Sequence, residues 1–269
     1  MKKKNIFSHL AQAGLAFAIA ALIGMGLMSC NKEKNKPGPE PKKEGIIMTT
    51  EKNIGDDITL KFHKDDAPVV EGATKNGEEA IEGEWKKQTY TLKAKNITIK
   101  GKVTWLDCSR CGLNSLDVSN NRGLTNLDCG YNTIQTLDVS KNTKLTELSC
   151  YGCGLNSLDV SKNEELTILR CGNNNLESLD VSKNLEIKII YCSRNKLTRA
   201  SLNLPNRTGK EEGKLNFRDS YTKGETQVLY KSVVKELKNN LNWKAYHYVK
   251  QKGSFPQWVE YEGIEILPG

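Results

Sequence analysis

Apolar residues between positions 103 and 204 recur at a fixed spacing of 21 residues. The unit over residues 124–142 reads LTNLDCGYNTIQTLDVSKN, and residues 145–163 repeat it as LTELSCYGCGLNSLDVSKN. In the first half of each unit apolar residues alternate with polar ones, the pattern of a β-strand with one buried face. A fixed period of this length is typical of solenoids, in which neighbouring coils share one continuous core. The pattern therefore predicts about five stacked coils.

The fourth and sixth positions of each unit, counted from its first apolar residue, are predicted to point inward. Stacked coils place equivalent residues about 4.8 Å apart, so leucine should cover leucine and cysteine should cover cysteine. These pairs are Leu106/Cys108, Leu127/Cys129, Leu148/Cys150, Leu169/Cys171 and Ile190/Cys192. The five cysteines are thus expected to form a structural ladder, and each buried Leu or Ile contributes roughly 1.5–3 kcal/mol.

The ninth position is where the chain must turn away from the strand. Three units carry Asn132, Asn174 or Asn195 there, and two carry Cys111 or Cys153. A carboxamide has both a donor and an acceptor end, so it can pair with backbone groups that a turn leaves without partners. We expect the three asparagines to hold the turns in this way.

The repeat L-x-x-L-x-C-x-x-N-x-L-x-x-L-D-V-S-x-N resembles the 21-residue repeats of cysteine-bearing internalins and of leucine-rich-repeat lipoproteins from Bacteroidetes. The flanking segments YTLKAKNITI (90–99), LPNRT (204–208) and WKAY (243–246) also resemble those lipoproteins. The resemblance implies a leucine-rich-repeat solenoid of parallel strands at the cell surface. It also implies adhesion or recognition and no catalysis.

The segments on either side of the repeats (residues 103–204) are predicted to cap the ends of the solenoid core. Residues 45–102 alternate with period two, which predicts an N-terminal β cap packed against Val103 and Leu106. Strands are expected at 58–62, 90–94 and 97–99, with turns at 64–66 and 75–79.

Residues 205–269 are predicted to form a C-terminal α/β cap. Apolar residues at helical spacing predict a helix over Gln227–Leu241, with Thr226 as its N-cap. Strands are expected at 243–249 and around 259–267.

The N-terminal 30 residues have the composition of a targeting segment, with three lysines followed by an apolar stretch. They end in Leu27-Met28-Ser29-Cys30, which resembles the bacterial lipobox, and this implies a lipid on Cys30. An ordinary signal peptide cut elsewhere, or an uncleaved anchor, is the alternative. Residues 31–44 are rich in Lys, Glu and Pro and are predicted to be a disordered tether. We therefore expect an outer-membrane lipoprotein exposed at the cell surface.

Composition and charge exclude several classes of function. The net charge is +8, and removing the three lysines of the targeting segment leaves +5, without a basic stripe interleaved with aromatic residues. Nucleic acid is therefore not an expected partner. The sequence also lacks a nucleophile elbow and a phosphate-binding loop, so no enzymatic activity and no cofactor are predicted.

Two motifs imitate metal sites, but the repeat accounts for both, and no metal is predicted. Cys108-x-x-Cys111 and Cys150-x-x-Cys153 look like a zinc pair, yet each cysteine already occupies a repeat position. D-V-S-x-N looks like the start of a calcium loop, but it lacks that loop's glycine and its final glutamate. Disulfides remain an alternative in an oxidising compartment; buried free thiols are the favoured interpretation.

The outward positions separate the two halves of the unit. The second halves repeat one set of outward residues, Ser or Thr, Asp and Ser, as a self-stacking surface requires. The first halves differ from coil to coil and are rich in Trp, Tyr and Arg, as binding hot spots are. The predicted ligand-binding residues are Trp105, Asp107, Arg110, Asn126, Asp128, Tyr131, Glu147, Tyr151, Ile168, Arg170, Asn173, Ile189, Tyr191 and Arg194.

The sequence therefore predicts an adhesion or binding protein that recognises a protein, peptide or glycan. One alternative is a structural envelope component that associates with copies of itself. Another is a glycan-binding module that uses Trp105, Tyr131 and Tyr151.

Overall fold

The computed structural model describes residues 45–197, 201–206, 213–216, 243–249 and 257–260. All of them belong to one compact unit, Lys43–Gly269. The predicted targeting segment with Cys30, the tether and the helix Gln227–Leu241 lie outside the described residues. Side chains are described in the first two ranges.

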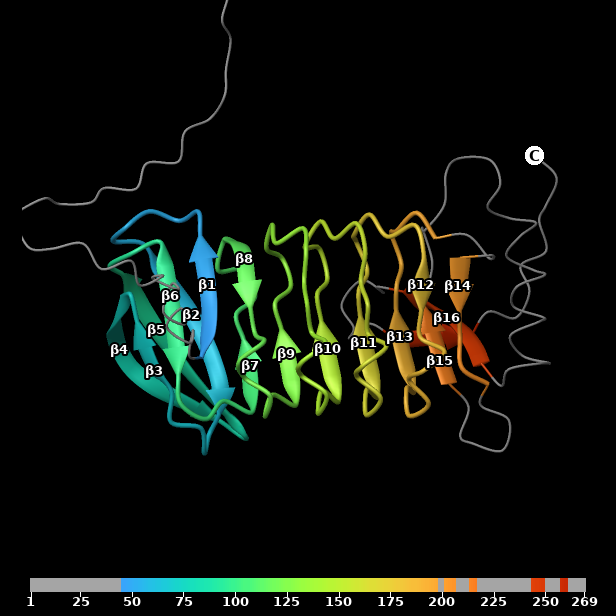
Figure 1. The fold of residues 1–269 in the computed structure, drawn as a ribbon, viewed down its shortest axis with the longest axis horizontal. Coiled ribbons are helices and arrows are strands. Elements are labelled where there is room, and N and C mark those ends of the chain that lie inside the picture. The colour runs from blue at the N-terminus through green and yellow to red at the C-terminus, as the bar shows by residue number, and fades with distance from the viewer. Residues whose placement is uncertain (1–44, 198–200, 207–212, 217–242, 250–256, 261–269) are drawn as a thin grey trace, which may run out of the picture. The chain divides into compact units, whose positions relative to one another are not determined.

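The repeats form a solenoid whose coils each place one short strand in a common parallel sheet (Figure 1). Neighbouring strands pair at a shift of 21 residues, so Leu127 lies between Leu106 and Leu148. The strands are β7 (Trp105–Asp107), β9 (Asn126–Asp128), β10 (Glu147–Ser149), β11 (Ile168–Arg170) and β13 (Ile189–Tyr191). The predicted leucine-rich-repeat solenoid is confirmed.

The sheet continues beyond the repeats at both ends to a total of eleven strands. After β13 come β15 (Gly213–Asn216), β16 (Trp243–Val249) and β17 (Gln257–Glu260). The predicted strand over 243–249 is confirmed, and the tail strand begins two residues earlier than expected. Its predicted continuation past Glu260 lies outside the described residues.

The N-terminal β cap continues both faces of the first coil. Strand β2 (Asp57–His63) pairs antiparallel with β7, and β1 (Ile46–Thr50) pairs antiparallel with β8 (Leu113–Asp117). The cap is completed by β3 (Val69–Glu71), β4 (Ala73–Glu82), β5 (Trp85–Leu92) and β6 (Asn96–Lys100). Because β2 and β1 each add to one face, the core of the first coil is covered as a terminal coil requires.

The turn predicted at 75–79 is wrong. These residues lie within β4, which forms the edge of the eleven-stranded sheet and pairs with β5. The register shifts between Asn76 and Ala80, and almost every residue of β4 is exposed. An edge strand that buries neither face does not need alternating apolar residues. The polar residues of β4 and Gly77 therefore look like a turn in the sequence although they form a strand. The turn at 64–65 is present as predicted.

One core runs through the cap and the coils. Phe62 and Met48 of the cap belong to the same buried cluster as the repeat leucines. The five ladder cysteines are fully buried, each with 0% exposure: Cys108, Cys129, Cys150, Cys171 and Cys192. No helix among the described residues is long and apolar enough to cross a membrane.

The asparagines at the ninth position hold the turns as predicted. Asn174 Nδ2 donates to the carbonyls of Cys150 and Cys171, both at 2.9 Å, and its Oδ1 accepts from the backbone N–H of Leu155 at 3.0 Å. In the coil that has Cys153 instead, the thiol donates to the carbonyl of Cys129 at 3.1 Å. The cysteine thus replaces the donor end of the carboxamide.

Candidate binding face

The parallel register brings the variable outward residues into two rows across the five strands. We call these rows and the turns that follow them the sheet face. The first row is Trp105, Asn126, Glu147, Ile168 and Ile189, and the second is Asp107, Asp128, Ser149, Arg170 and Tyr191. All of these residues are partly exposed except Ser149, which is 8% exposed.

The eighth position of every coil has a left-handed backbone. The φ angles are 58° at Arg110, 56° at Tyr131, 67° at Gly152, 54° at Asn173 and 56° at Arg194. This conformation lets the chain leave the strand while its N–H still pairs with the next coil, as Tyr131 does with the carbonyl of Tyr151 at 2.7 Å. Glycine adopts it freely and asparagine tolerates it, whereas other residues lose roughly 1–2 kcal/mol.

Three side chains of the first three coils form a stack on this part of the sheet face. The guanidinium carbon of Arg110 lies 3.8 Å from the centre of the Tyr131 ring, and the rings of Tyr131 and Tyr151 are 5.2 Å apart. Tyr151 in turn covers Gly172, where an added Cβ would lie 3.0 Å from the ring. An added Cβ would also lie 3.0 Å from the backbone carbonyl oxygen of Ser193, so the missing side chain at Gly172 makes room for both the tyrosine ring and the next coil.

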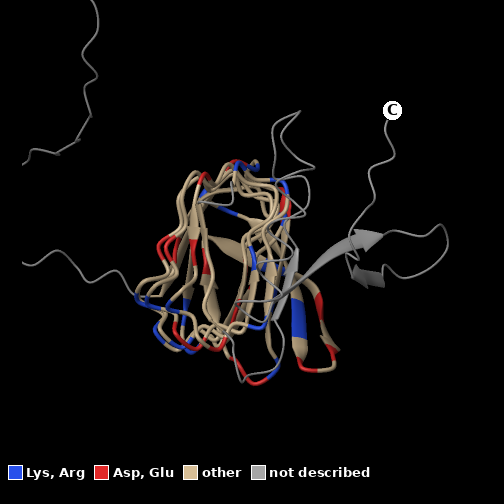
Figure 2. Ribbon diagram, turned by 90° about the vertical axis from the view of Figure 1, so that its right-hand side faces the viewer, with Lys and Arg blue, Asp and Glu red and all other residues tan. Residues whose placement is uncertain are grey.

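Charges on the second row change along the solenoid. Asp107 is paired with Lys61 of β2 at 3.3 Å, and Arg170 is paired with Glu147 at 3.4 Å. Between them, burial raises the pKa of Asp128, and the neighbouring carboxylate of Asp107 raises it further. Over the described residues, basic and acidic residues are interspersed along the ribbon of the coils (Figure 2).

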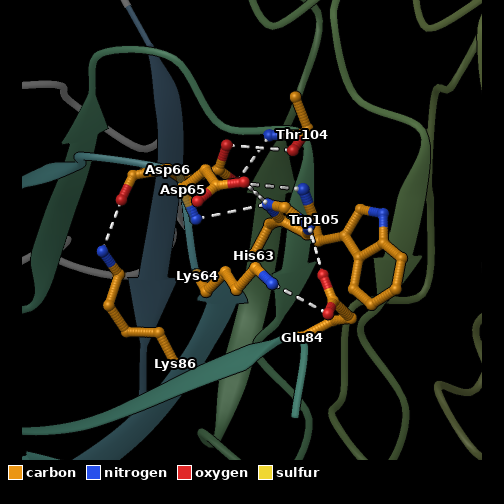
Figure 3. A network of polar contacts seen from close by, with 8 residues as sticks. All are labelled: His63, Lys64, Asp65, Asp66, Glu84, Lys86, Thr104 and Trp105. Carbon is orange, nitrogen blue, oxygen red and sulfur yellow. Dashed lines mark hydrogen bonds and ion pairs between the residues drawn. The ribbon is translucent and has the colours of Figure 1, made fainter. Parts of the chain in front are cut away.

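Trp105 belongs to the junction with the cap as well as to the sheet face. Its ring lies 4.2 Å from the ring of Trp85 and 5.3 Å from that of His63. Nearby, the buried carboxylate of Asp66 accepts hydrogen bonds from the backbone N–H groups of Thr104 and Trp105 (Figure 3). The cap therefore fixes where the first coil begins.

Cap residues also extend the sheet face beyond the predicted set. His63 lies 3.4 Å from Glu84, which also pairs with Lys64 at 2.9 Å (Figure 3). The sequence prediction did not include His63 or Trp85. The alternation of residues in β2 and β5 could have identified both positions from the sequence. Phe62 is buried, so its neighbour His63 must point outward.

The constant outward residues of the second halves serve the turns themselves. Asp138 accepts a hydrogen bond from the backbone N–H of Ser140 at 2.8 Å, and Asp159 does the same for Ser161 at 2.8 Å. These bonds lower the pKa of both aspartates below the usual carboxyl range. The Asp and Ser of the D-V-S-x-N motif are therefore explained by local backbone capping, and its Asn by bonds to the preceding coil, as Asn142 Nδ2 donates to the carbonyl of Val118 at 2.9 Å.

The ladder cysteines are in an apolar environment that keeps them protonated. Burial raises the pKa of Cys192 to about 12, and it also raises the pKa of Cys150 and Cys171. The seven cysteines of the described residues are free thiols, and no group of three or more potential metal ligands occurs there. The five ladder thiols therefore pack as small hydrophobic groups and are poor nucleophiles.

Fold and face together define a leucine-rich-repeat solenoid with a buried cysteine ladder and a variable sheet face. No protein-family model matches the chain, and no curated protein matches it. Among solved structures, the chain is similar to "Functional domain of InlJ from Listeria monocytogenes includes a cysteine ladder". The sequence identity is 30%, over 44% of this chain and 30% of that chain, with a TM-score of 0.33. The match thus spans less than a third of the length of that neighbour.

Proposed function

We propose that this chain is a lipid-anchored protein of the bacterial cell envelope that binds a macromolecule through its sheet face. The observation that carries the proposal is the choice of residue at the left-handed eighth positions. Coils three and four place Gly152 and Asn173 there, which suit that backbone. The other coils place Arg110, Tyr131 and Arg194 there and accept the strain.

Burial does not account for these three side chains. All three residues are exposed, Tyr131 to 50%. Strained backbone is retained where a side chain is needed for something other than folding, and strained residues gather at ligand sites. Tyr and Arg are also the residue types that dominate binding hot spots. Binding of a partner is the function that this combination supports best.

The size and shape of the face favour a protein or peptide as the partner. Five strands at about 4.8 Å spacing span roughly 20–25 Å, which fits a peptide or a small epitope. A sugar stacks on an open ring face, but Arg110 lies 3.8 Å from the centre of the Tyr131 ring and Tyr151 covers Gly172. Tyr131 is still 50% exposed, which suits contacts with polypeptide.

Anchoring is proposed on the sequence before residue 45. The tetrad ending in Cys30 would place a diacylglyceryl group at the new N-terminus, and residues 31–44 would hold the solenoid away from the membrane. Replacing Cys30 with Ala should prevent lipid attachment and release the protein from the membrane. Mass spectrometry of the native protein that finds an unmodified N-terminus would contradict this part of the proposal.

The binding proposal is tested with a triple variant, Arg110→Asn, Tyr131→Asn and Arg194→Asn, which adopts the residue that coil four already uses. The intact chain and the variant are each used to capture and cross-link macromolecules from cell surfaces. The matched control carries Thr136→Asn, Ser157→Asn and Ser178→Asn on the constant face. We expect the triple variant to lose capture while the control retains it. Equal capture by both would overturn the assignment.

A further inference from the structure

We propose that the sheet face reads an extended peptide with one basic side chain on Asp128 and an acidic side chain, three residues away, on Arg170. This inference rests on the proposed function, because it names the class of partner for the same face. The two residues lie in one row, separated by Ser149 of β10. Each of the two has the opposite charge to the ligand group that it would receive.

Asp128 has no cation within ion-pair distance among the described residues, and the attraction of Arg170 for its carboxylate is weaker than the opposing effects of burial and Asp107. Its neighbour in register is Asp107, which Lys61 already pairs at 3.3 Å. Like charges directly opposite each other on adjacent strands destabilise a sheet. Among the described side chains, no ion pair reaches Asp128. A cationic ligand group placed over Asp128 would offset both the repulsion from Asp107 and the cost of burying the carboxylate charge.

The turn alone does not explain Asp128. Its Oδ1 accepts a hydrogen bond from the backbone N–H of Gly130 at 2.9 Å, as a turn-capping aspartate does. However, the next two coils have Ser149 and Arg170 at the same position. Their strands stay in register and their turns are built from the same hydrogen bonds between coils. The turn therefore tolerates other residues, and the carboxylate is available for another role.

Arg170 can bind a ligand carboxylate without losing its present partner, Glu147. One of its terminal nitrogens lies 3.4 Å from Glu147, and both side chains are 40% exposed. An exposed pair of this kind contributes little stability. A guanidinium has five N–H donors in a planar fork, so the remaining donors can form a paired contact with a carboxylate. The ring of Tyr191, 5.6 Å away, lies on one side of the guanidinium.

The distance between the two residues selects the ligand conformation. Two strand spacings separate β9 from β11, or about 9.6 Å. A polyproline-type segment repeats its face every three residues, at about 9.3 Å. A β-strand repeats its face at about 6.6 or 13 Å, and neither value matches. The spacing therefore favours a ligand in the polyproline-type conformation, with basic and acidic residues at i and i+3.

The test uses a set of synthetic proline-rich peptides with blocked ends and the intact chain in surface plasmon resonance. One peptide carries Lys and Glu three residues apart. The others place them two or four apart, replace Lys by norleucine or Glu by Gln, or carry two Lys or two Glu. We expect the three-residue Lys/Glu peptide to bind best, with about tenfold weaker binding when either charge is removed.

Variants then assign each charge to its residue. Asp128→Asn should abolish the preference for Lys over norleucine and retain the preference for Glu over Gln. Arg170→Gln should abolish the preference for Glu over Gln and retain the preference for Lys over norleucine. Asp128→Lys should shift the preference to the peptide with two Glu, a gain that an unfolded variant could not show.

Two outcomes would overturn the inference. In the first, peptides bind irrespective of their charge but lose binding in the triple Asn variant; the proposed function then stands and this ligand class is wrong. In the second, no peptide binds at all, or the preference for Lys survives in Asp128→Asn. The capture experiment with cell surfaces decides the proposed function separately in both cases.

Discussion

The residue at a left-handed turn can be exchanged to separate folding from binding, and Tyr131→Asn is the sharpest case. Tyr131 has a φ of 56°, and Asn173 has almost the same angle, 54°, at the equivalent place two coils later. Asparagine should therefore recover about 1 kcal/mol of backbone strain at position 131. The substitution keeps the backbone and removes the ring.

The contacts that Tyr131 loses are of similar size to the strain it relieves. The Arg110 guanidinium at 3.8 Å is worth roughly 0.5–1 kcal/mol at an exposed ring. The Tyr151 ring at 5.2 Å is worth roughly 0.5–1.5 kcal/mol. Together the lost contacts are worth about 1–2.5 kcal/mol, and the relieved strain offsets about 1 kcal/mol of this, so the free energy of unfolding should fall by about 0–1.5 kcal/mol. Capture of the partner should fall sharply.

Urea unfolding followed by circular dichroism measures the free energy of unfolding, and the capture assay measures binding of the partner. The reverse exchange, Asn173→Tyr, is the matched control, because it introduces the strain without the stack and should cost about 1 kcal/mol. A loss above about 3 kcal/mol in Tyr131→Asn would show that the tyrosine is retained for folding. The inference from strain to binding would then fail.

Three further predictions concern charge, the turn asparagines and the cysteine ladder. The folded state raises the pKa of Asp128, so folding favours the protonated carboxyl. The contribution of Asp128 to stability is therefore complete below the usual carboxyl pKa near 4, and it is lost as pH rises through the folded pKa. Asp128→Asn should therefore be more stable than the parent at neutral pH in urea titrations, and a constant difference down to acid pH would refute this account. Asn174→Ala removes buried partners from Cys150, Cys171 and Leu155 and should cost about 3–5 kcal/mol, against under about 0.5 kcal/mol for the exposed Asn175→Ala. The buried thiol of Cys150 should resist thiol reagents until the protein unfolds, and Cys150→Ser should cost roughly 1–3 kcal/mol; rapid labelling of the folded protein would contradict the ladder.

Two expectations about the cap show why edges are hard to predict. The sequence indicated strands around Phe62 and Ile99, because their alternate residues are buried. It did not indicate β4, whose residues are stabilised by backbone pairing with β5 and not by burial. Backbone hydrogen bonds depend little on side-chain type. A strand that is stabilised by these bonds and not by side-chain burial therefore has almost no recognisable sequence pattern.

The sequence by itself determined the coil, its period and its register. Identical inward residues every 21 positions can all be buried in one register, because a slip of one residue would turn Leu127 and Cys129 outward. It also showed which outward positions vary. The tertiary structure alone decided how those outward residues meet: Arg110 lies over Tyr131, Trp85 packs against Trp105, and Lys61 pairs with Asp107, whereas no ion pair among the described residues reaches Asp128. These contacts join residues that are 20 to 46 positions apart in the sequence and that strand pairing and backbone angles bring together. The alternation of apolar and polar residues shows only that such a side chain points outward, and it does not show which side chains lie beside it.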